Sequence, residues 1–321
     1  MFRLVHLSDV HLGPLPKVRR RELASKRITG YVNWHRNRRD AMGSDTLEKL
    51  IAHIHAAKAD HIVITGDLVN LALNSEIELI ADWLRTIGAP SQVTVIPGNH
   101  DTYVPGALDR IRHAWRPYMS GDGANECLFP FRRDLNDRES QTPISLIGCN
   151  SGRATAPFMA TGSFREQQGH ALAEMLERTA TEQRFRVVLI HHPPFKGATA
   201  WNKRLIGASR FRKVVRQQGA ELVLHGHTHL ASDEIIKGPY HPVRVFGVPS
   251  ASQGARAINA KQGKPGAQYN VFEIHKKIAS DLDAPSGWAV RFDRFGYADG
   301  AREITHLHAQ TFEVTRQPPA A

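Results

Sequence analysis

Residues 97–101 read Pro97-Gly98-Asn99-His100-Asp101, and they follow a short apolar run at 93–96 that is typical of a buried β-strand. Gly, Asn and Asp favour turns for backbone reasons, so this segment alone predicts only a tight turn. Four other strand-like runs of the chain end in the same way, in a polar segment that carries Asp, Asn or His. The fold and the site are both predicted from this shared ending.

The other four polar segments are Ser8-Asp9-Val10-His11, Gly66-Asp67-Leu68-Val69-Asn70, His191-His192-Pro193-Pro194 and His225-Gly226-His227-Thr228-His229. Sheets of α/β proteins carry their sites at the carboxyl ends of strands, so we expect these segments to meet. Residues i and i+2 of an extended segment point the same way. The side chains of Asp9 and His11 are therefore expected to bind one common ion or ligand. The same is expected of His227 and His229.

Strand-like and helix-like patterns alternate along the first 226 residues. Strands are predicted at 3–7, 61–65, 93–96, 144–148, 186–190 and 221–224, and helices at 45–57, 76–87, 106–118, 165–179 and 208–218. Consecutive short strands follow at 232–236, 243–248, 269–274, 289–295 and 311–314, with a loop at 252–268. The alternation predicts a central sheet covered by helices, and the tail predicts a second, largely antiparallel sheet packed on it.

In their order, the five polar segments resemble the signature D-x-H, G-D, G-N-H-D, H and G-H-x-H of the calcineurin-like metallophosphoesterases, from residue 3 to about 250. The wording of the later segments, with Val248-Pro249-Ser250-Ala251-Ser252, is similar to the cyclic-nucleotide phosphodiesterase-like branch. The resemblance implies an α/β fold. Its form is a four-layer α-β-β-α sandwich with two packed mixed β-sheets and a dinuclear metal site at the strand C-terminal ends. We expect one domain over residues 1–315, with a basic insertion at 14–44 and a frayed tail at 316–321.

The resemblance also implies the role of each residue in the site. Asp9, His11 and His229 are expected to hold the first metal, Asn99, His191 and His227 the second, and Asp67 to bridge the two. The cofactors are two divalent ions from among Mn, Fe, Zn and Mg, with Mn favoured, because carboxylate, amide oxygen and imidazole suit these ions.

His100 is not a ligand in the family pattern. It is expected beside the leaving-group oxygen, where it stabilises charge or donates a proton, with Asp101 orienting its ring. Asn150 and Arg153 are further candidates for contact with the substrate. His192 is another, although its place beside a ligand also fits a packing role.

Charge arithmetic predicts the reaction. Two divalent ions carry +4 and the two Asp ligands return −2, which leaves +2 for a hydroxide and a phosphate oxygen. Paired metals about 3.5–4 Å apart lower the pKa of a bridging water towards roughly 7. With the family resemblance, this leads us to expect a phosphodiesterase in which a metal-bridging hydroxide attacks the phosphorus of a phosphate-ester substrate. The wording of the later segments, which resembles the cyclic-nucleotide phosphodiesterase-like branch, favours a cyclic nucleotide or small diester.

Most of the positive charge lies in the insertion. The formal net charge is +11, and residues 17–39 carry nine Lys and Arg against one acid, Glu22. A helical wheel places Leu23, Ala24, Ile28, Tyr31, Val32 and Trp34 within half of the circumference. A basic helix of this kind is typical of peripheral contact with an anionic membrane. The alternative is a helix packed on the domain with a solvated basic face. In either case its place directly after His11 predicts that the insertion overhangs the metal site as a lid.

Composition excludes several other classes. No apolar run approaches the roughly 18–20 residues that cross a bilayer. The two cysteines, Cys127 and Cys149, exclude a disulfide scaffold and a four-thiolate zinc site. Residues 1–6 lack a signal-peptide pattern, so the expected location is cytoplasmic, extending to the inner membrane surface if the insertion binds there.

Three alternative functions remain open. One is a membrane-surface pyrophosphatase acting on a UDP-diacylglucosamine-like lipid, since the basic, aromatic insertion suits an amphiphilic substrate. Another is a nuclease, although the chain has no dedicated nucleic-acid module and its charge is confined to one segment. The last is a catalytically dead scaffold, which the presence of all seven ligand positions and His100 argues against.

Overall fold

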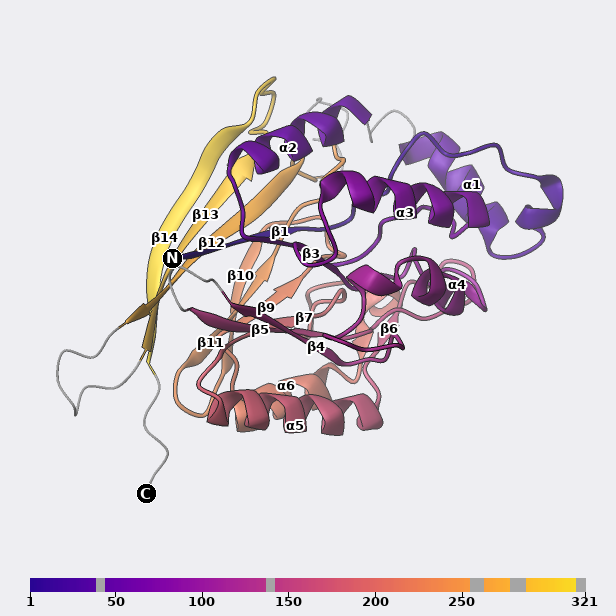
Figure 1. Ribbon diagram of the computed structural model, residues 1–321. Helices are drawn as coiled ribbons and strands as arrows, with labels where there is room; N and C mark the ends of the chain where they lie inside the picture. The colour runs from indigo at the N-terminus through magenta and orange to yellow at the C-terminus, as the bar shows by residue number, and fades with distance from the viewer. Residues whose placement is uncertain (39–43, 137–141, 255–262, 278–286, 316–321) are drawn as a thin grey trace.

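The computed structural model describes residues 1–38, 44–136, 142–254, 263–277 and 287–315. Residues 39–43 of the predicted insertion, residues 255–262 of the predicted loop and the predicted tail at 316–321 lie outside the described residues. Within the described residues the chain forms two six-stranded mixed sheets and a two-stranded one (Figure 1).

The first sheet has the strand order β14-β13-β12-β1-β2-β3. Its strands are β1 (Phe2–Leu7), β2 (His61–Ile64), β3 (Val93–Val95), β12 (Gln268–Lys277), β13 (Gly287–Gly296) and β14 (Thr305–Thr315). β1, β2 and β3 are parallel, whereas β12, β13 and β14 add antiparallel pairs beyond β1. The three parallel strands therefore end at one edge of this sheet.

The second sheet has the order β10-β11-β9-β7-β5-β4. Its strands are β4 (Phe131–Asn136), β5 (Pro143–Gly148), β7 (Phe185–Leu189), β9 (Leu222–His225), β10 (Ser232–Lys237) and β11 (Pro242–Gly247). The four central strands are parallel, and β4 and β10 close the edges in antiparallel fashion. The two-stranded sheet pairs β6 (Gly162–Ser163) with β8 (Leu205–Ile206).

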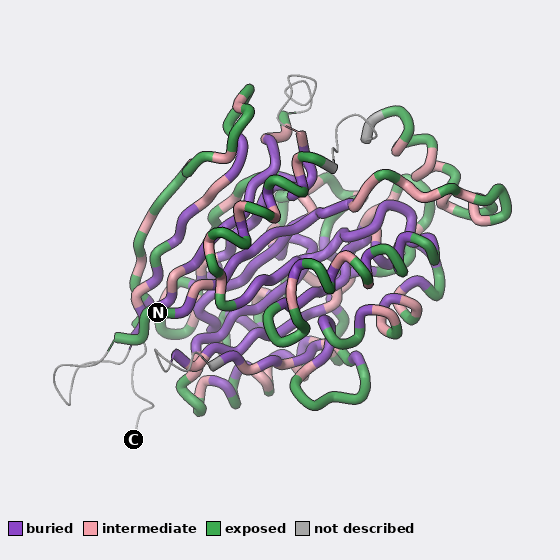
Figure 2. Tube along the Cα trace, turned by 45° about the horizontal axis from the view of Figure 1, so that its top comes forward, coloured by how far each residue is buried: buried purple, intermediate pink, exposed green. Residues whose placement is uncertain are grey.

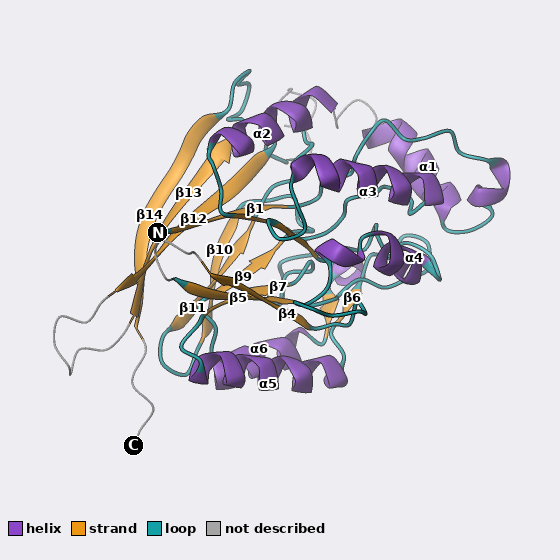
Figure 3. Cartoon of the chain, in the orientation of Figure 1, coloured by secondary structure: helices purple, strands orange, loops and turns teal. Residues whose placement is uncertain are grey.

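Helices cover the outer face of each sheet (Figure 3). The first sheet carries α2 (Ser44–Ala56), α3 (Asn74–Ile87) and α4 (Ala107–Ala114), and the second carries α5 (Glu166–Thr181) and α6 (Ala208–Gln218). Short turns η3 (Arg116–Tyr118) and η4 (Trp201–Lys203) join them to neighbouring segments. The order of layers is helix, sheet, sheet, helix, as the family resemblance implied.

Alternation along the strands produces the layers. In β1, Val5 and Leu7 pack with the helix-side cluster, whereas Leu4 packs between the two sheets. In β9, Val223 faces α5 and α6, and Leu224 faces the other sheet. Each such side chain contributes about 1.5–3 kcal/mol when fully buried. The inner strands of both sheets are accordingly buried over most of their length, whereas the edge strands β10 and β14 are largely exposed (Figure 2).

The prediction that the tail strands form a sheet of their own is wrong. β12 to β14 extend the first sheet, because β12 pairs with β1 in the register Leu4 to Phe272. β10 and β11 extend the second, because β11 pairs in parallel with β9. Without these partners β1 and β9 would be edge strands with unpaired backbone groups. The unpredicted strand β4 covers the opposite edge of the second sheet.

The helical wheel predicted one continuous basic helix for the insertion, and this prediction is wrong. It forms three short segments, η1 (Arg20–Leu23), α1 (Arg27–Asn33) and η2 (Trp34–Arg38). Tyr31 packs against the core of the first sheet, whereas Ile28 and Val32 are 54% and 41% exposed. Its apolar side chains are thus divided between the domain and the solvent. Among the helices described here, none has both the length and the apolar character that crossing a membrane requires.

Candidate metal centre

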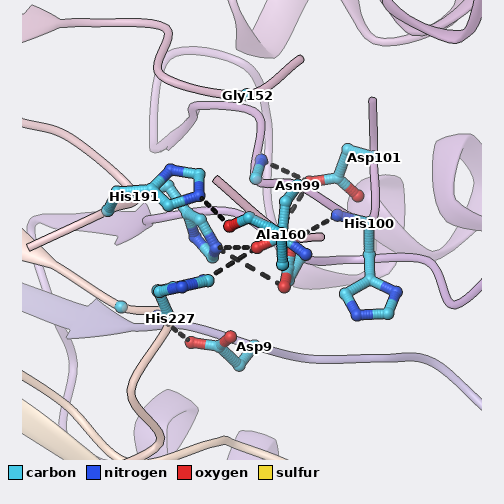
Figure 4. A network of polar contacts seen from close by, with 12 residues as sticks. Asp9, Asn99, His100, Asp101, Gly152, Ala160, His191 and His227 are labelled. Carbon is cyan, nitrogen blue, oxygen red and sulfur yellow. Dashed lines mark hydrogen bonds and ion pairs between the residues drawn. The ribbon is translucent and has the colours of Figure 1, made fainter. Parts of the chain in front are cut away.

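The five polar segments meet at one end of the molecule. β1, β2 and β3 of the first sheet and β7 and β9 of the second each lead directly into one of them. Asp9, Asn99, His191 and His227, which come from four of these segments, lie close together (Figure 4). Three overlapping groups have ligand atoms within 4.8 Å of one another: Asp9 with His11 and His229, His11 with Asp67 and His100, and Asp67 with His191 and His227.

The residues expected at each metal lie together. In the first set, Asp9 Oδ1 is 3.1 Å from Nε2 of His229 and 3.9 Å from Nε2 of His11. In the second set, Asn99 Oδ1 is 3.2 Å from Nε2 of His191 and 2.8 Å from Nδ1 of His227. Each set thus points oxygen and nitrogen donors at a shared space.

Asp67 lies between the two sets. Its Oδ2 is 3.9 Å from Nε2 of His11 in the first set and 3.4 Å from Nε2 of His191 in the second. Its Oδ1 accepts the backbone N–H of His100 at 2.7 Å, which fixes the rotation of the carboxylate. One oxygen therefore faces both sets, as a bridging ligand must.

The chemistry of this donor set fits two divalent cations. Six of the seven side chains are buried and His227 is partly buried, so two carboxylates and four imidazoles are concentrated away from water. Such a concentration of polar groups is costly unless they are paired or bind a metal. The set contains oxygen and nitrogen donors and no thiolate, which suits Mn, Fe, Zn or Mg. The residues present therefore fit the dinuclear centre that the family implies.

Electrostatics within the site couple Asp67 to His191. Burial alone would raise the pKa of Asp67, but the charges of His191 and His100 hold it well below its ordinary value. Burial likewise lowers the pKa of His191, and Asp67 more than offsets this, raising it to about 9. A proton on His191 thus balances Asp67 when no cation is bound. Metal binding at these ligands must displace that proton.

The backbone at the site is strained. Asp9, His11, Asp67, His227 and His229 have φ of 53°, 41°, 57°, 70° and 56°, and they are five of the nine non-glycine residues with positive φ among those described. Left-handed backbone costs a residue with a side chain roughly 1–2 kcal/mol. The expectation that Asp9 with His11, and His227 with His229, align because they are extended is therefore wrong. Tight turns after the strands bring these side chains together, and such strain is typical of functional sites.

His100 lies beside the two sets, but the group that orients it differs from our expectation. Its Nδ1 is 2.6 Å from the backbone carbonyl oxygen of Asn70, which can only accept, so Nδ1 carries the hydrogen. The ring stacks on Tyr103 with centroids 5.3 Å apart and planes 9° apart. The Asn70 carbonyl and the Tyr103 ring therefore fix the His100 ring, and Nε2 is its other hydrogen-bonding atom.

Asp101 was expected to orient His100, and the structure corrects this. Its Oδ1 accepts the N–H groups of Leu68 and Val69, and its Oδ2 those of Asp67 and Gly98, at 2.7–3.1 Å. Burial and the Asp67 charge raise the pKa of Asp101 to about 7, while the Gly98 and Val69 N–H groups act against that rise. Asp101 therefore ties the loop after β2 to the loop after β3, and these loops carry Asp67 and Asn99.

A cavity of about 280 Å³ opens above the two sets. Its floor includes Asp67, Asn99, His100, His227 and His229. The insertion forms one wall, as its place after His11 predicted, and contributes Lys26, Thr29, Gly30, Asn33 and Trp34. The other lining residues are Asn70, Leu71, Tyr103, Phe158, Met159, Ala160, Lys203 and Lys264. Asp67 is the sole acid among the described residues that line the cavity, whereas three lysines do so.

Asn150, Arg153 and His192 are not among the residues that line the cavity above the two sets, and their contact with a substrate stays a prediction. Asn150 and Arg153 line a separate hollow, and Arg153 binds Thr161 through its guanidinium. His192 is fully buried, with Nδ1 2.8 Å from the Ser151 hydroxyl and Nε2 3.1 Å from the Ala160 carbonyl oxygen. Both ring nitrogens of His192 are thus used inside the protein, and the packing alternative describes this residue.

Sequence reasoning missed several residues at the site. The Asn70 carbonyl acts through its backbone, so side-chain identity gave no signal for it. Tyr103 follows Asp101 by two positions, and an aromatic residue so close to His100 is a signal that could have been used. Phe158 and Lys203 come from loops of the second sheet, and no local pattern relates those loops to the metal ligands.

Comparison with known proteins gives a consistent picture. A sequence model of one family, described as calcineurin-like phosphoesterase, matches residues 2–231. The fold is similar to that of a dimetal phosphatase from Danio rerio, at 12% identity and a TM-score of 0.57, with 98% of each chain covered. It is also similar to a purple acid phosphatase from yellow lupin (Lupinus luteus) seeds, at 10% identity and a TM-score of 0.51, covering 98% of this chain and 54% of that one. No curated protein matches the sequence.

Proposed function

The chain belongs to the calcineurin-like phosphoesterase family, and on that premise we propose that it is a dinuclear metal-dependent phosphodiesterase acting on a cyclic nucleotide or another small diester. The family provides the broader class, a metal-dependent hydrolase of phosphate esters. The observation that best supports the proposal is the position of Asp67, whose Oδ2 faces His11 at 3.9 Å and His191 at 3.4 Å.

We assign the ligand roles as follows. Asp9, His11 and His229 would hold one ion, Asn99, His191 and His227 would hold the other, and Asp67 would be shared between them. Two divalent ions held there supply Lewis-acid activation of water and neutralise charge on the phosphoryl group. Asp101 keeps Asp67 and Asn99 in place through the N–H groups of their loops.

Charge in the cavity favours a phosphate ester as the substrate. The two Asp ligands carry −2, so a pair of divalent cations leaves a surplus of +2 at the floor. Lys26, Lys203 and Lys264 add positive charge at the walls. A phosphodiester group is therefore attracted to the floor, with its ester substituents directed toward the mouth.

His100 is suited to act on the leaving group. Its Nδ1–H donates to the Asn70 carbonyl, so Nε2 is the atom that exchanges a proton with the substrate. When the ring is cationic, Nε2 carries a hydrogen and can donate it to the departing oxygen. We therefore propose His100 as the general acid.

A turnover panel tests the proposal. The protein is loaded with Mn(II) and given cyclic nucleotides, a chromogenic phosphodiester, phosphomonoesters, a UDP-lipid pyrophosphate and single-stranded DNA. Hydrolysis of the small diesters, its loss with a chelator and its recovery with Mn(II) are the expected results. A protein that binds two metal equivalents but hydrolyses none of these esters would overturn the proposal.

A second candidate is the membrane-surface pyrophosphatase, and one observation favours it. Phe158 lines the cavity and is 82% exposed, and Trp201 is 69% exposed. Their loops are joined, because Asn202 Nδ2 donates to the Phe158 carbonyl at 2.9 Å. An exposed aromatic side chain at a phosphate-binding cavity, with a second on the neighbouring loop, suits an amphiphilic substrate. Residues 17–39 would approach an anionic membrane through their basic charge.

Vesicle sedimentation separates this candidate from the first. We expect binding to vesicles that contain anionic lipid, weaker binding at high salt, and reduced binding of a Phe158→Ser, Trp201→Ser double variant. The control is a vesicle of neutral lipid alone. Equal recovery with both vesicle types, together with cleavage of small diesters only, would exclude the membrane-surface function.

A further inference from the structure

Lys26 reaches from the insertion into the cavity above the metal ligands. Its Nζ is 2.6 Å from the Thr155 hydroxyl, 2.6 Å from the Met159 carbonyl oxygen and 4.4 Å from the centroid of the Tyr103 ring. An ammonium group has three N–H donors, and the hydroxyl and the carbonyl accept two of them. One donor therefore remains for an acceptor that enters the cavity.

The groups in contact with the Lys26 ammonium carry no charge. Its partners are a hydroxyl, a carbonyl and an aromatic ring, all of them neutral. Burial lowers the pKa of Lys26 to about 8, and Asp67 opposes that shift. Holding a partly buried ammonium among neutral groups costs free energy that an anion in contact with it would offset.

We propose that Lys26 binds a second phosphoryl group of the substrate, next to the one that is attacked. This inference rests on the proposed function and names a substrate preference for the same site. Lys203 and Lys264 line the same cavity, and Asp67 is the one acid among its described lining residues. Within the proposed class of small phosphodiester-type substrates, the preferred member is then an ester with two adjacent anionic phosphoryl groups.

The competing explanation is that Lys26 only fastens the insertion to the domain. Arg27 provides a matched control, because it is the next residue of α1 and also fastens the insertion. Its Nε donates to the Leu71 carbonyl at 2.9 Å and its Nη2 to the Ala72 carbonyl at 2.6 Å. Arg27 does not line the cavity. Its removal therefore weakens the attachment without changing the charge that a substrate meets.

The test compares two substrates that differ by one phosphoryl group, the p-nitrophenyl esters of thymidine monophosphate and thymidine diphosphate. Their products are separated by chromatography, because cleavage of the P–O–P bond releases p-nitrophenyl phosphate rather than coloured p-nitrophenol. Both esters are assayed with the Mn(II)-loaded wild type and with the variants Lys26→Met, Lys26→Arg and Arg27→Met. Losing a hydrogen bond to a charged group should raise the KM of Lys26→Met for the diphosphate ester about tenfold or more. Its KM for the monophosphate ester should rise by a clearly smaller factor, because Lys26 attracts that ester through its charge but does not contact a second phosphoryl group on it. Lys26→Arg should keep most of the preference, because the cation is retained.

Two results would overturn the inference. One is an equal effect of Lys26→Met on both esters, and the other is an equal loss in Arg27→Met, since either shows that fastening the insertion is the whole role. Calorimetry with methylenediphosphonate and methylphosphonate, at saturating Mn(II), separates this failure from that of the proposed function. The wild type should bind methylenediphosphonate more tightly than methylphosphonate, and Lys26→Met should not. That result would support the subsite even if no ester is hydrolysed.

Discussion

Replacing Asp101 by Asn should destabilise the site rather than alter the final chemical step. The carboxylate of Asp101 accepts four backbone N–H groups from the loops after β2 and β3. An asparagine amide keeps one accepting oxygen and turns its NH₂ group, itself a donor, toward the other two N–H groups. Two hydrogen bonds to a charged group are lost, each worth about 1.5–3 kcal/mol. The expected loss of stability is therefore about 3–6 kcal/mol, a large part of the roughly 5–15 kcal/mol that stabilises a typical domain.

Urea unfolding of metal-free protein at pH 8 measures this loss, since Asp101 is ionised there. Metal content after dialysis against limiting Mn(II) measures the second effect, because the same loops carry Asp67 and Asn99. His100→Asn is the matched control and should leave both quantities near those of the wild type. The reasoning is refuted if Asp101→Asn unfolds within about 1 kcal/mol of the wild type and binds two metal equivalents, yet loses activity with poor leaving groups. That pattern would instead support the first expectation, that Asp101 orients the His100 ring.

Three further perturbations have definite expected outcomes. Asp67→Asn should lose both metal equivalents, because a neutral amide cannot bridge two cations as a carboxylate does, and two metals by elemental analysis would contradict the bridging role. His100→Ala should keep its metals and lose about 10²–10⁴-fold in turnover of esters with poor leaving groups, with a smaller loss for p-nitrophenyl esters; equal losses on both would argue against a general acid. His61 is buried against Thr94, with a pKa that burial and Arg133 lower from 6.5 to about 3. Below pH 6.5 the unfolded state alone takes up this proton, so stability falls by about 1.4 kcal/mol per pH unit until about pH 3. Between pH 6.5 and pH 5, the free energy of unfolding of His61→Gln in urea should therefore fall by about 2 kcal/mol less than that of the wild type. Identical losses would exclude this source of acid sensitivity.

Features that depend on residues close together in the chain could be predicted from the sequence. Each of the five polar segments follows its strand where the pattern placed it, and the ligand sets implied by the family resemblance lie together in space. Strands such as β1 and β9 could be predicted because each is a short, mostly apolar run, as expected of a buried strand. Helix α6 has the bounds that were predicted, since its apolar face repeats with the helical period.

Features that depend on distant partners could not be predicted in this way. The pairing of β12 with β1 joins residues about 270 positions apart, and nothing near Phe272 in the sequence specifies that neighbour. β4 was missed because half of its residues are charged, and Arg133 lies buried there because backbone carbonyls accept its hydrogen bonds. The role of Asp101 depends on the N–H groups of another loop, for which side-chain identity carries no information.

The division of the ligands between the two sheets has a consequence for biosynthesis. The first sheet supplies Asp9, His11, Asp67 and Asn99 from the early part of the chain, and the second supplies His191, His227 and His229 much later. A ribosome must therefore release most of the polypeptide before either cation finds its full set of donors. Cations bound by ligands from both sheets would then link one sheet to the other. A truncated or half-assembled chain would lack part of the ligand set and would bind the cations poorly.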